Sequence, residues 1–454
     1  MELRKLKLIK KIIPAVLFIV VFGLYIYTDP RVATNYADSN ELIAASYTLG
    51  VPHPPGYPIF ILVGKLFSFI PIGEIAFRYS IMASFFGALT VLFVYLGIIK
   101  LFEYYEEDEK EFIFRLVPAI IAAFSLTFAY LFWLYSLVPE VFNFSNFFAA
   151  LLAYTGICWY EQKKKADKTA VLVSRDKYPF LIALFMGLAV VSQQVTFVLI
   201  PPFFFAALIL DKDIYKPSKR WLKVISGFIL GLLPIIYLPI VSFTNPIIDY
   251  GNTTTLKKLW YHLSRKIYAG PTGNAYFPTK LNIDLRISEL LNYLPTFTDQ
   301  FTLPIVCLGL LGILSLVFIL AKRKFNDPKV FIGIIFLFGG PLLSAYLYLD
   351  RRNFPGYNVM AAQDRIFLMG MVLFAFFIGM GVRSLLKIVK KSKYLSLPII
   401  AHLLMVLPFL AFRRNFSTVN KNNFYLGEDF AYNLFVNIEP NAIFFTTGDM
   451  PSFR

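Results

Sequence analysis

The sequence predicts an all-α protein that crosses a membrane many times, and three observations lead to this prediction. First, 57% of the 454 residues are hydrophobic, whereas soluble domains have about 45–50% apolar residues. Second, the apolar residues gather in runs of roughly 17–25 residues, the length that a helix needs to cross a hydrocarbon core. Third, the basic residues cluster in short segments between these runs, as topology signals do.

Eleven apolar runs predict the membrane spans. The first, Ile12–Tyr27, follows a basic N-terminal segment. No small-residue cleavage site follows it, which favours a signal anchor over a cleaved signal peptide. The two runs on either side of Gln193-Gln194 are the shortest. The ten further runs are Ala76–Ile99, Leu116–Tyr135, Val141–Tyr160, Pro179–Val191, Thr196–Leu210, Leu222–Phe243, Leu303–Leu320, Phe331–Leu349, Ile366–Val382 and Leu395–Phe412.

The positions of the charged residues predict the orientation. With the N-terminus in the cytoplasm, most of the 44 lysines and arginines lie on the cytoplasmic side, in short turns such as Glu161–Lys177. This distribution satisfies the positive-inside rule. The opposite side then carries a first outer loop (28–75), a large outer loop (244–301) and a tail (413–454). We therefore expect one membrane domain over residues 1–412 and an extracytoplasmic C-terminus.

Composition argues against several classes of function. The net charge of +16 does not predict a nucleic-acid partner, because the basic residues are divided among short turns instead of forming one patch. Cys158 and Cys307 lie inside apolar runs and cannot form a disulfide framework. Since the chain has only three histidines, a metal site would have to use carboxylates.

The first outer loop contains the densest motif, Asp38–Pro58. Residues Ser39–Leu49 suit a short helix that Gly50 and Pro52 end. An apolar stripe along this helix suits the membrane surface and consists of Leu42, Ala45 and Leu49. The next run, Tyr57–Ile70, is only about 14 residues long, too short to cross a bilayer. We therefore expect interfacial or re-entrant helices in this loop.

Two carboxylates open the first helix of this loop. Asp38 and Glu41 are three residues apart and project from one side. They could bind a divalent cation through oxygen, or one could act as a general base. The simpler alternative is a capping box, with Asp38 as N-cap and Glu41 as its partner. His53 precedes two prolines that impose an extended corner, and it either donates to a phosphate or is solvated at an interfacial turn.

The segment Asp38–Pro58, with Lys65, Pro71-Ile72-Gly73 and Phe77-Arg78, resembles the N-terminal signature of the protein O-mannosyltransferase-like membrane family. Further elements similar to that family are Pro139-Glu140-Val141-Phe142, Asn245-Pro246, Asp249-Tyr250-Gly251-Asn252, Thr255-Leu256, Trp260, His262, Arg265, Tyr268 and Asn441–Phe445 with Gly448-Asp449. Two features depart from the family: Gln193-Gln194 replaces a histidine pair, and the chain ends soon after Asp449, where relatives continue. Residues 413–454 therefore resemble the start of a C-terminal domain.

The resemblance implies the family-C glycosyltransferase fold and a sugar donor linked to polyprenyl or dolichyl phosphate. It also implies that Asp38 is the catalytic acid–base group and that Glu41 is its neighbour. The candidates for binding the donor or its phosphate are His53, Glu140, His262, Arg265, Lys266 and Arg365. The candidates for lining the substrate site are Tyr57, Gln193, Gln194, Trp260 and Tyr268, although Trp260 and Tyr268 fit interfacial anchors better. A metal ion would use Asp38, Glu41 or Glu140.

Together these observations predict a membrane glycosyltransferase. It would move a sugar, mannose by the resemblance, from a polyprenyl-phosphate donor to a hydroxyl of a protein or glycan at the extracytoplasmic face. Direct displacement would invert the anomeric centre. Two alternatives stay open: a transporter or flippase, which would carry charges near the centres of its spans, and a polymerase or ligase of lipid-linked glycans. Membrane lipids are the other expected partner.

Overall fold

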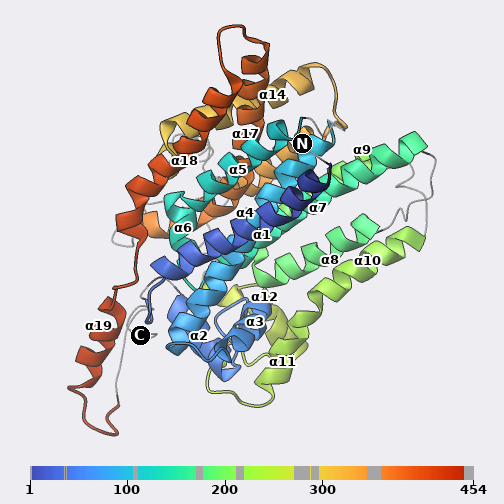
Figure 1. Ribbon diagram of the computed structural model, residues 1–454. Coiled ribbons are helices and arrows are strands. Elements are labelled where there is room, and N and C mark those ends of the chain that lie inside the picture. Colours follow the sequence, from blue (N-terminus) through green and yellow to red (C-terminus); the bar gives the residue numbers. More distant parts are fainter. Residues whose placement is uncertain are drawn as a thin grey trace.

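The computed structural model describes residues 3–34, 36, 38–105, 111–169, 177–210, 219–269, 287, 296–344 and 359–443. Within these ranges every regular element is a helix, apart from one isolated parallel bridge between Val51 and Asp249. The long helices run side by side as a bundle. Three short helices, α2 (Ser39–Thr48), α3 (Pro58–Ser68) and α12 (Leu256–Leu263), gather at one end of this bundle (Figure 1).

Six helices in the described ranges are long and apolar enough to cross a membrane. They are α1 (Leu3–Thr28), α4 (Ile75–Glu103), the helix from α10 (Lys219–Leu232) through η3 (Leu233–Ile236) to α11 (Tyr237–Ser242), α14 (Leu303–Ala321), α17 (Val359–Lys391) and α18 (Leu397–Val419). Helices α4 and α17 are largely buried, whereas α1, α14 and α18 expose apolar side chains such as Ile19, Leu314 and Leu403. Such surface suits lipid and not water, so the chain is an integral membrane protein.

The remaining helices are shorter or less apolar. They are α5 (Ile113–Thr127), α6 (Tyr130–Leu137), α7 (Phe142–Thr169), α8 (Lys177–Ser192), η2 (Gln194–Leu199), α9 (Ile200–Leu210), η4 (Lys266–Ala269), α15 (Pro328–Leu337), η5 (Phe338–Leu342) and α19 (Leu426–Phe435). Each of the eleven predicted runs overlaps a helix, although the end of the run 331–349 lies outside the described residues. The count of eleven spans is not confirmed, because several of these helices are too short to cross alone.

The predicted span Leu116–Tyr135 is not one continuous helix. Helices α5 and α6 meet there at a bend of 65°. A helix that breaks inside a bundle frees backbone groups, which must find other partners. Here the Asn415 side chain donates to the carbonyl of Phe128 (2.8 Å), and Oε1 of Gln300 accepts the N–H of Leu131 (3.0 Å). Partners that are far away in the sequence therefore stabilise the break.

Helix α2 ends at Thr48, as predicted, but its apolar stripe does not face a membrane surface. Leu42 and Ala45 are completely buried in the protein, and only Leu49 is partly exposed. The hydroxyl of Ser46 donates to the carbonyl of Ile61 in α3 (2.8 Å). Helix α2 is therefore part of the protein core, and its first turn is held in place by packing.

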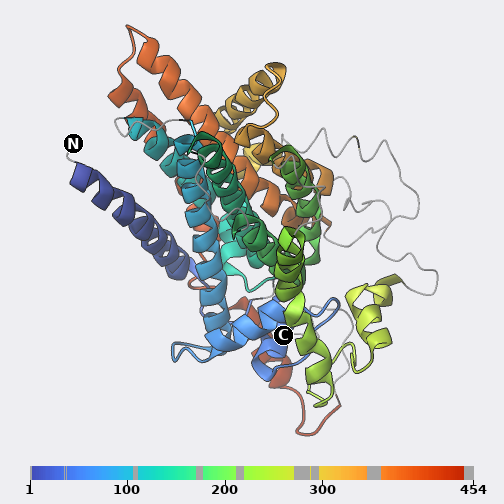
Figure 2. The ribbon, with the colours of Figure 1, turned by 90° about the vertical axis from the view of Figure 1, so that its right-hand side faces the viewer.

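The two predicted outer loops meet at this end of the bundle. The N–H of Val51 donates to the carbonyl of Ile248 (2.8 Å), and the N–H of Tyr250 donates to the carbonyl of Val51 (3.0 Å). A Cβ on Gly50 would lie 2.5 Å from the Ile248 oxygen, so only glycine allows this approach. Figure 2 shows from a second side that α2 and α3 lie at the end of the long helices, beside α11.

Candidate active site

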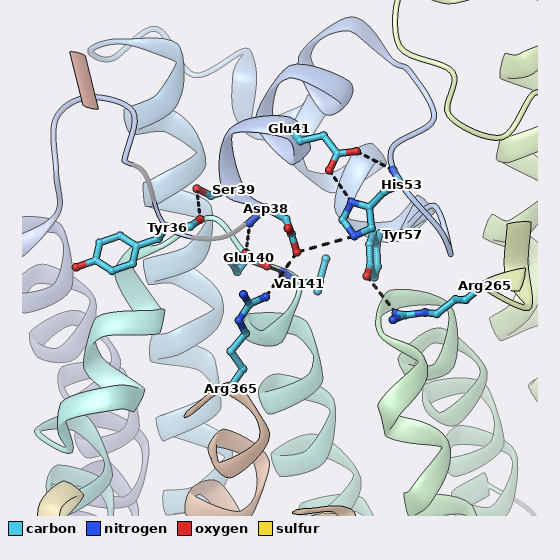
Figure 3. Close-up of polar contacts among 10 residues, drawn as sticks. All are labelled: Tyr36, Asp38, Ser39, Glu41, His53, Tyr57, Glu140, Val141, Arg265 and Arg365. Carbon is cyan, nitrogen blue, oxygen red and sulfur yellow. Dashed lines mark hydrogen bonds and ion pairs between the residues drawn. The ribbon is translucent and has the colours of Figure 1, made fainter. Parts of the chain in front are cut away.

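His53 lies between the two carboxylates of the first outer loop (Figure 3). Its backbone N–H donates to Oε1 of Glu41 (2.7 Å), and its ring Nδ1 lies 2.5 Å from Oε2 of Glu41. The other ring nitrogen, Nε2, lies 3.9 Å from Oδ2 of Asp38. Burial lowers the pKa of His53, but the hydrogen bond and charge of Glu41, with the charges of Asp38 and Glu140, outweigh burial and raise this pKa above 6.5.

The proline-rich corner positions the His53 ring. The N–H of Gly56 donates to the carbonyl of His53 (2.9 Å) and closes a turn. Gly56 has a φ of 94°, which favours glycine. A Cβ at this position would also lie 2.8 Å from the side chain of Leu238. The turn leads directly into α3, which has Pro58 in its first turn, where a missing N–H is tolerated.

The capping-box alternative for Asp38 and Glu41 is wrong. Asp38 precedes α2, but its side chain accepts no hydrogen bond from the first turn of the helix. The buried carboxylate of Glu41 is directed to His53 with both of its oxygens. The carboxylate of Asp38 is 34% exposed, and its Oδ2 lies 3.5 Å from Nη1 of Arg365 in α17. The two carboxylates therefore serve a polar cluster and not helix termination.

Glu140 is buried beside Asp38, just before α7. Its Oε1 accepts the backbone N–H of Asp38 (2.9 Å), and its Oε2 accepts the N–H of Val141 (3.3 Å). Burial and the charge of Asp38 raise the pKa of Glu140 to about 7, against the opposing effect of Arg365. Glu140 therefore holds the main chain that carries Asp38, a position that does not suit its expected contact with a phosphate.

Arg265 approaches the same cluster from the other side, after α12 (Figure 3). Its Nη2 donates to the hydroxyl of Tyr57 (3.1 Å), and its Nε donates to Oε1 of Gln194 (3.1 Å). Among the described residues no carboxylate lies within ion-pair distance of Arg265. Its backbone has a φ of 56°, which is strained for a residue with a Cβ. The ring of Tyr57 packs edge-on against His53, with centroids 5.2 Å apart.

Two further predicted site residues lie in the interior. His262 is 2% exposed, and its ring fits against two glycines: a Cβ on Gly251 would lie 2.4 Å from Nδ1, and one on Gly56 would lie 3.1 Å from Nε2. Burial and the charge of His53 lower the pKa of His262 to about 4. A neutral, enclosed ring packs the two loops together and does not present a donor to a phosphate. Gln193 is buried as well, whereas its neighbour Gln194 contacts Arg265.

The predicted residues on and after α12 are peripheral. Trp260 is 64% exposed, and Lys266 is exposed. The position of Trp260 suits the expected interfacial anchor, and the position of Lys266 suits a cation at the rim of the site. The side chain of Tyr268 lies outside the described residues.

The expected divalent cation finds no ready ligand set. No group of three or more His, Cys, Asp and Glu side chains in the described part of the chain is arranged around a common point. Both oxygens of Glu41 bind His53, and both oxygens of Glu140 accept backbone N–H groups. These carboxylates would have to leave their partners in order to ligate a metal ion.

Sequence reasoning missed Asp29, at the end of α1. Its carboxylate is completely buried; Oδ2 accepts the hydroxyl of Ser84 (2.8 Å), and Oδ1 has no partner in the described structure. Burial raises its pKa well above the usual value. The signal that could have found it is the acidic residue directly after an apolar run, since an unpaired carboxylate is costly there.

Comparison with known proteins finds similarity to protein O-mannosyl-transferases. Residues 38–216 match the family model described as the protein O-mannosyl-transferase TMEM260 N-terminal domain. Protein O-mannosyl-transferase tmem260 of Dictyostelium discoideum is 26% identical over 449 residues, which are 91% of this chain and 51% of that protein. Protein O-mannosyl-transferase TMEM260 of Mus musculus is 26% identical over 447 residues, 96% of this chain and 58% of that protein. The chain spans just over half the length of these relatives.

Solved structures show the fold. The Archaeoglobus fulgidus oligosaccharyltransferase in complex with Zn and sulfate superposes with a TM-score of 0.52 at 15% identity, over 89% of this chain and 53% of that chain. The archaeal oligosaccharyltransferase AglB from Archaeoglobus fulgidus, in complex with an inhibitory peptide and a dolichol-phosphate, gives a TM-score of 0.51 at 12% identity, over 95% of this chain and 59% of that chain. The chain therefore shares the fold of this oligosaccharyltransferase. The similarity to protein O-mannosyl-transferases confirms the resemblance seen in the sequence.

Proposed function

We propose that this chain is a membrane glycosyltransferase, which moves a sugar from a polyprenyl-phosphate donor to a hydroxyl group of a protein or glycan. One observation carries the proposal: a partly exposed carboxylate, Asp38, lies between Arg365 and His53, and a second arginine, Arg265, lies on the far side of Tyr57 (Figure 3). A base with cations around it is what sugar transfer from a phosphate requires. The names of the relatives make mannose the first sugar to test.

Asp38 is the general base in this mechanism. Its Oδ2 faces Arg365 and His53, whereas its Oδ1 is bound by no described residue and can accept the proton of the acceptor hydroxyl. The O–H bond of the acceptor breaks, a bond forms between that oxygen and the anomeric carbon, and the bond from the anomeric carbon to the phosphate oxygen breaks. The lipid phosphate leaves with the bonding electron pair. A single displacement of this kind inverts the anomeric centre.

Arg265 binds the phosphate. Its planar guanidinium is oriented by the neutral groups Tyr57 and Gln194, so its positive charge is not consumed by a carboxylate of the described structure. Arginine forms paired, charge-assisted hydrogen bonds with phosphate oxygens. The strained backbone at Arg265 fits a functional constraint of this kind. Arg365, in contrast, is directed to Asp38, with its Nη1 3.5 Å from Oδ2.

The active site is extracytoplasmic in this proposal. The predicted outer loops 28–75 and 244–301 meet at the end of the bundle that carries Asp38. A polyprenyl tail would stay in the bilayer while the acceptor approaches from the aqueous side. The distribution of lysines and arginines in the sequence supports this orientation.

Reconstitution tests the proposal. The purified protein in liposomes receives radiolabelled mannosyl-phosphoryl-polyprenol and a peptide rich in serine and threonine, and we expect labelled peptide. Movement of the labelled lipid across the bilayer without labelled peptide would instead support a flippase. EDTA or added Mn²⁺ in the same assay tests the cation, and we expect neither to change the rate, because Glu41 is held by His53.

A further inference from the structure

The carboxylate of Glu41 holds His53 at two points and thereby orients its ring. One oxygen accepts the backbone N–H and the other lies 2.5 Å from Nδ1. Since Glu41 is 2% exposed, it has no access to water that could compete for these contacts. A carboxylate at Nδ1 places the ring proton of a neutral histidine on that nitrogen. The lone pair of Nε2 is then directed toward Asp38.

The gap between Nε2 and Asp38 is short enough for proton transfer after a small movement. It measures 3.9 Å, and catalytic hydrogen bonds are often long before substrate binds. The His53 side chain is 17% exposed and that of Asp38 is 34% exposed, so both reach the solvent-accessible part of the cluster. His53 therefore connects the partly exposed base with a buried carboxylate.

The charged and titratable groups around His53 favour its protonated form. Glu41 faces it from α2, Asp38 from the N-cap of α2, and Glu140 from the segment before α7. Tyr57 faces it from the residue before α3, and His262 from α12. Arg365 and Arg265 lie one contact further away. The acidic groups outweigh burial and raise the pKa of His53. The neutral imidazole of His53 is consequently a better proton acceptor than an ordinary histidine.

We propose that Glu41, His53 and Asp38 form a proton relay, in which His53 removes from Asp38 the proton that Asp38 takes from the acceptor hydroxyl. This inference rests on the proposed function and replaces the sequence-based expectation that His53 donates to the phosphate. The proton moves from the acceptor oxygen to Oδ1 of Asp38, and it passes to Nε2 after the carboxyl group has rotated to bring this oxygen to His53. Glu41 stabilises the resulting imidazolium, and the proton passes to solvent after the products leave. Asp38 is the catalytic residue, and Glu41 and His53 act through it.

The first test needs no substrate. The chain has three histidines, so NMR of the protein labelled with ¹³C-histidine in nanodiscs gives three ring signals, which H53Q, H262Q and H402Q assign. We expect the signal that H53Q removes to titrate above pH 6.5, and to move to lower pH in E41Q and in D38N. Titration of this ring at or below pH 6.5 in the unmodified protein would overturn the relay. The titration of His53 in the unmodified protein tests the relay even if E41Q does not fold.

The second test uses the pH dependence of sugar transfer. A protonated His53 cannot accept a proton, so activity should fall as the pH drops through the pKa of His53. H53Q should lower the rate at pH 8 about 10–100-fold, and should move the acidic decline to lower pH. H402Q, an exposed histidine of α18, is the matched control and should keep the unmodified profile. An acidic decline unchanged in H53Q would overturn the relay. Absence of transfer by the unmodified protein would instead refute the proposed function, and the NMR result would stand.

Discussion

Helix α7 connects two charged clusters that satisfy their carboxylates in different ways. Glu140 directly precedes the helix, and Glu161 lies about 30 Å further along it, from a rise of 1.5 Å per residue. At the distant end, Glu161 lies 2.7 Å from both Lys100 and Lys165, and Glu103 lies 3.1 Å from Lys100. These carboxylates have lysine partners, which is the arrangement of a structural ion-pair network.

The cluster around Asp38 differs from this network. Glu140 accepts only backbone N–H groups, Glu41 holds a histidine, and Arg265 is bound to neutral side chains. Titratable groups with perturbed pKa values, such as His53 and Glu140, are typical of functional sites. One end of α7 therefore carries a structural ion-pair network, whereas the other carries the cluster that we propose as the active site.

The largest effect is expected from D38N, which removes the proposed general base and keeps the size of the side chain. We expect sugar transfer to fall about 1,000-fold, within the range of general-base catalysis. Initial rates with a saturating mannosyl-phosphoryl-polyprenol donor measure this. Activity of D38N within a few-fold of the unmodified protein would remove Asp38 from the mechanism.

The next effect is expected from R265Q. Loss of a charge-assisted contact worth about 1.5–3 kcal/mol should lower kcat/KM for the lipid donor about 10–100-fold, mainly through KM. K165Q removes a lysine at the other end of α7, which is exposed, and serves as the matched control. Equal effects of the two substitutions would show that charge in general matters, and not the position of Arg265.

The pH dependence of stability should separate Glu140 from the distant network. The pKa of Glu140 in the folded protein, about 7, is above its usual value of 4.5. A raised pKa contributes stability that is complete below the unfolded pKa and is lost as the pH rises through the folded pKa. The Tm should therefore decrease between pH 4.5 and 7, and E140Q should weaken this decrease. An identical pH profile in E140Q would contradict the assignment.

The smallest effect on activity is expected from E161Q. This substitution breaks two ion pairs of the distant network, so it should lower the Tm. Transfer per folded molecule should not change, because Glu161 is about 30 Å from the start of α7. Measuring both quantities on one preparation checks this. A loss of sugar transfer in E161Q as large as that in D38N would show that the two clusters do not differ in function.

The sequence predicted the membrane class, the similarity to protein O-mannosyl-transferases and the meeting of Asp38, Glu41, Glu140, Arg265 and Arg365 at one end of the bundle. Charge placement and span length are local properties, so they can be evaluated without a structure. The apolar stripe of Leu42 and Ala45 was misassigned because core and lipid select the same side chains.

Other features depend on contacts between distant segments and could not be predicted. The break between α5 and α6 depends on Asn415 and Gln300. The capping box failed because the His53 ring, twelve residues away, competes for Glu41. The enclosure of His262 results from glycines in two different loops. In each case a partner far along the chain decided between two locally acceptable arrangements.

A cryo-EM structure of the protein with bound polyprenyl phosphate tests the central claim most directly. We predict phosphate density within hydrogen-bonding distance of the Arg265 guanidinium, on the side of Tyr57 that faces Asp38. Phosphate density at the Lys100 end of α7, with none beside Arg265, would contradict the account.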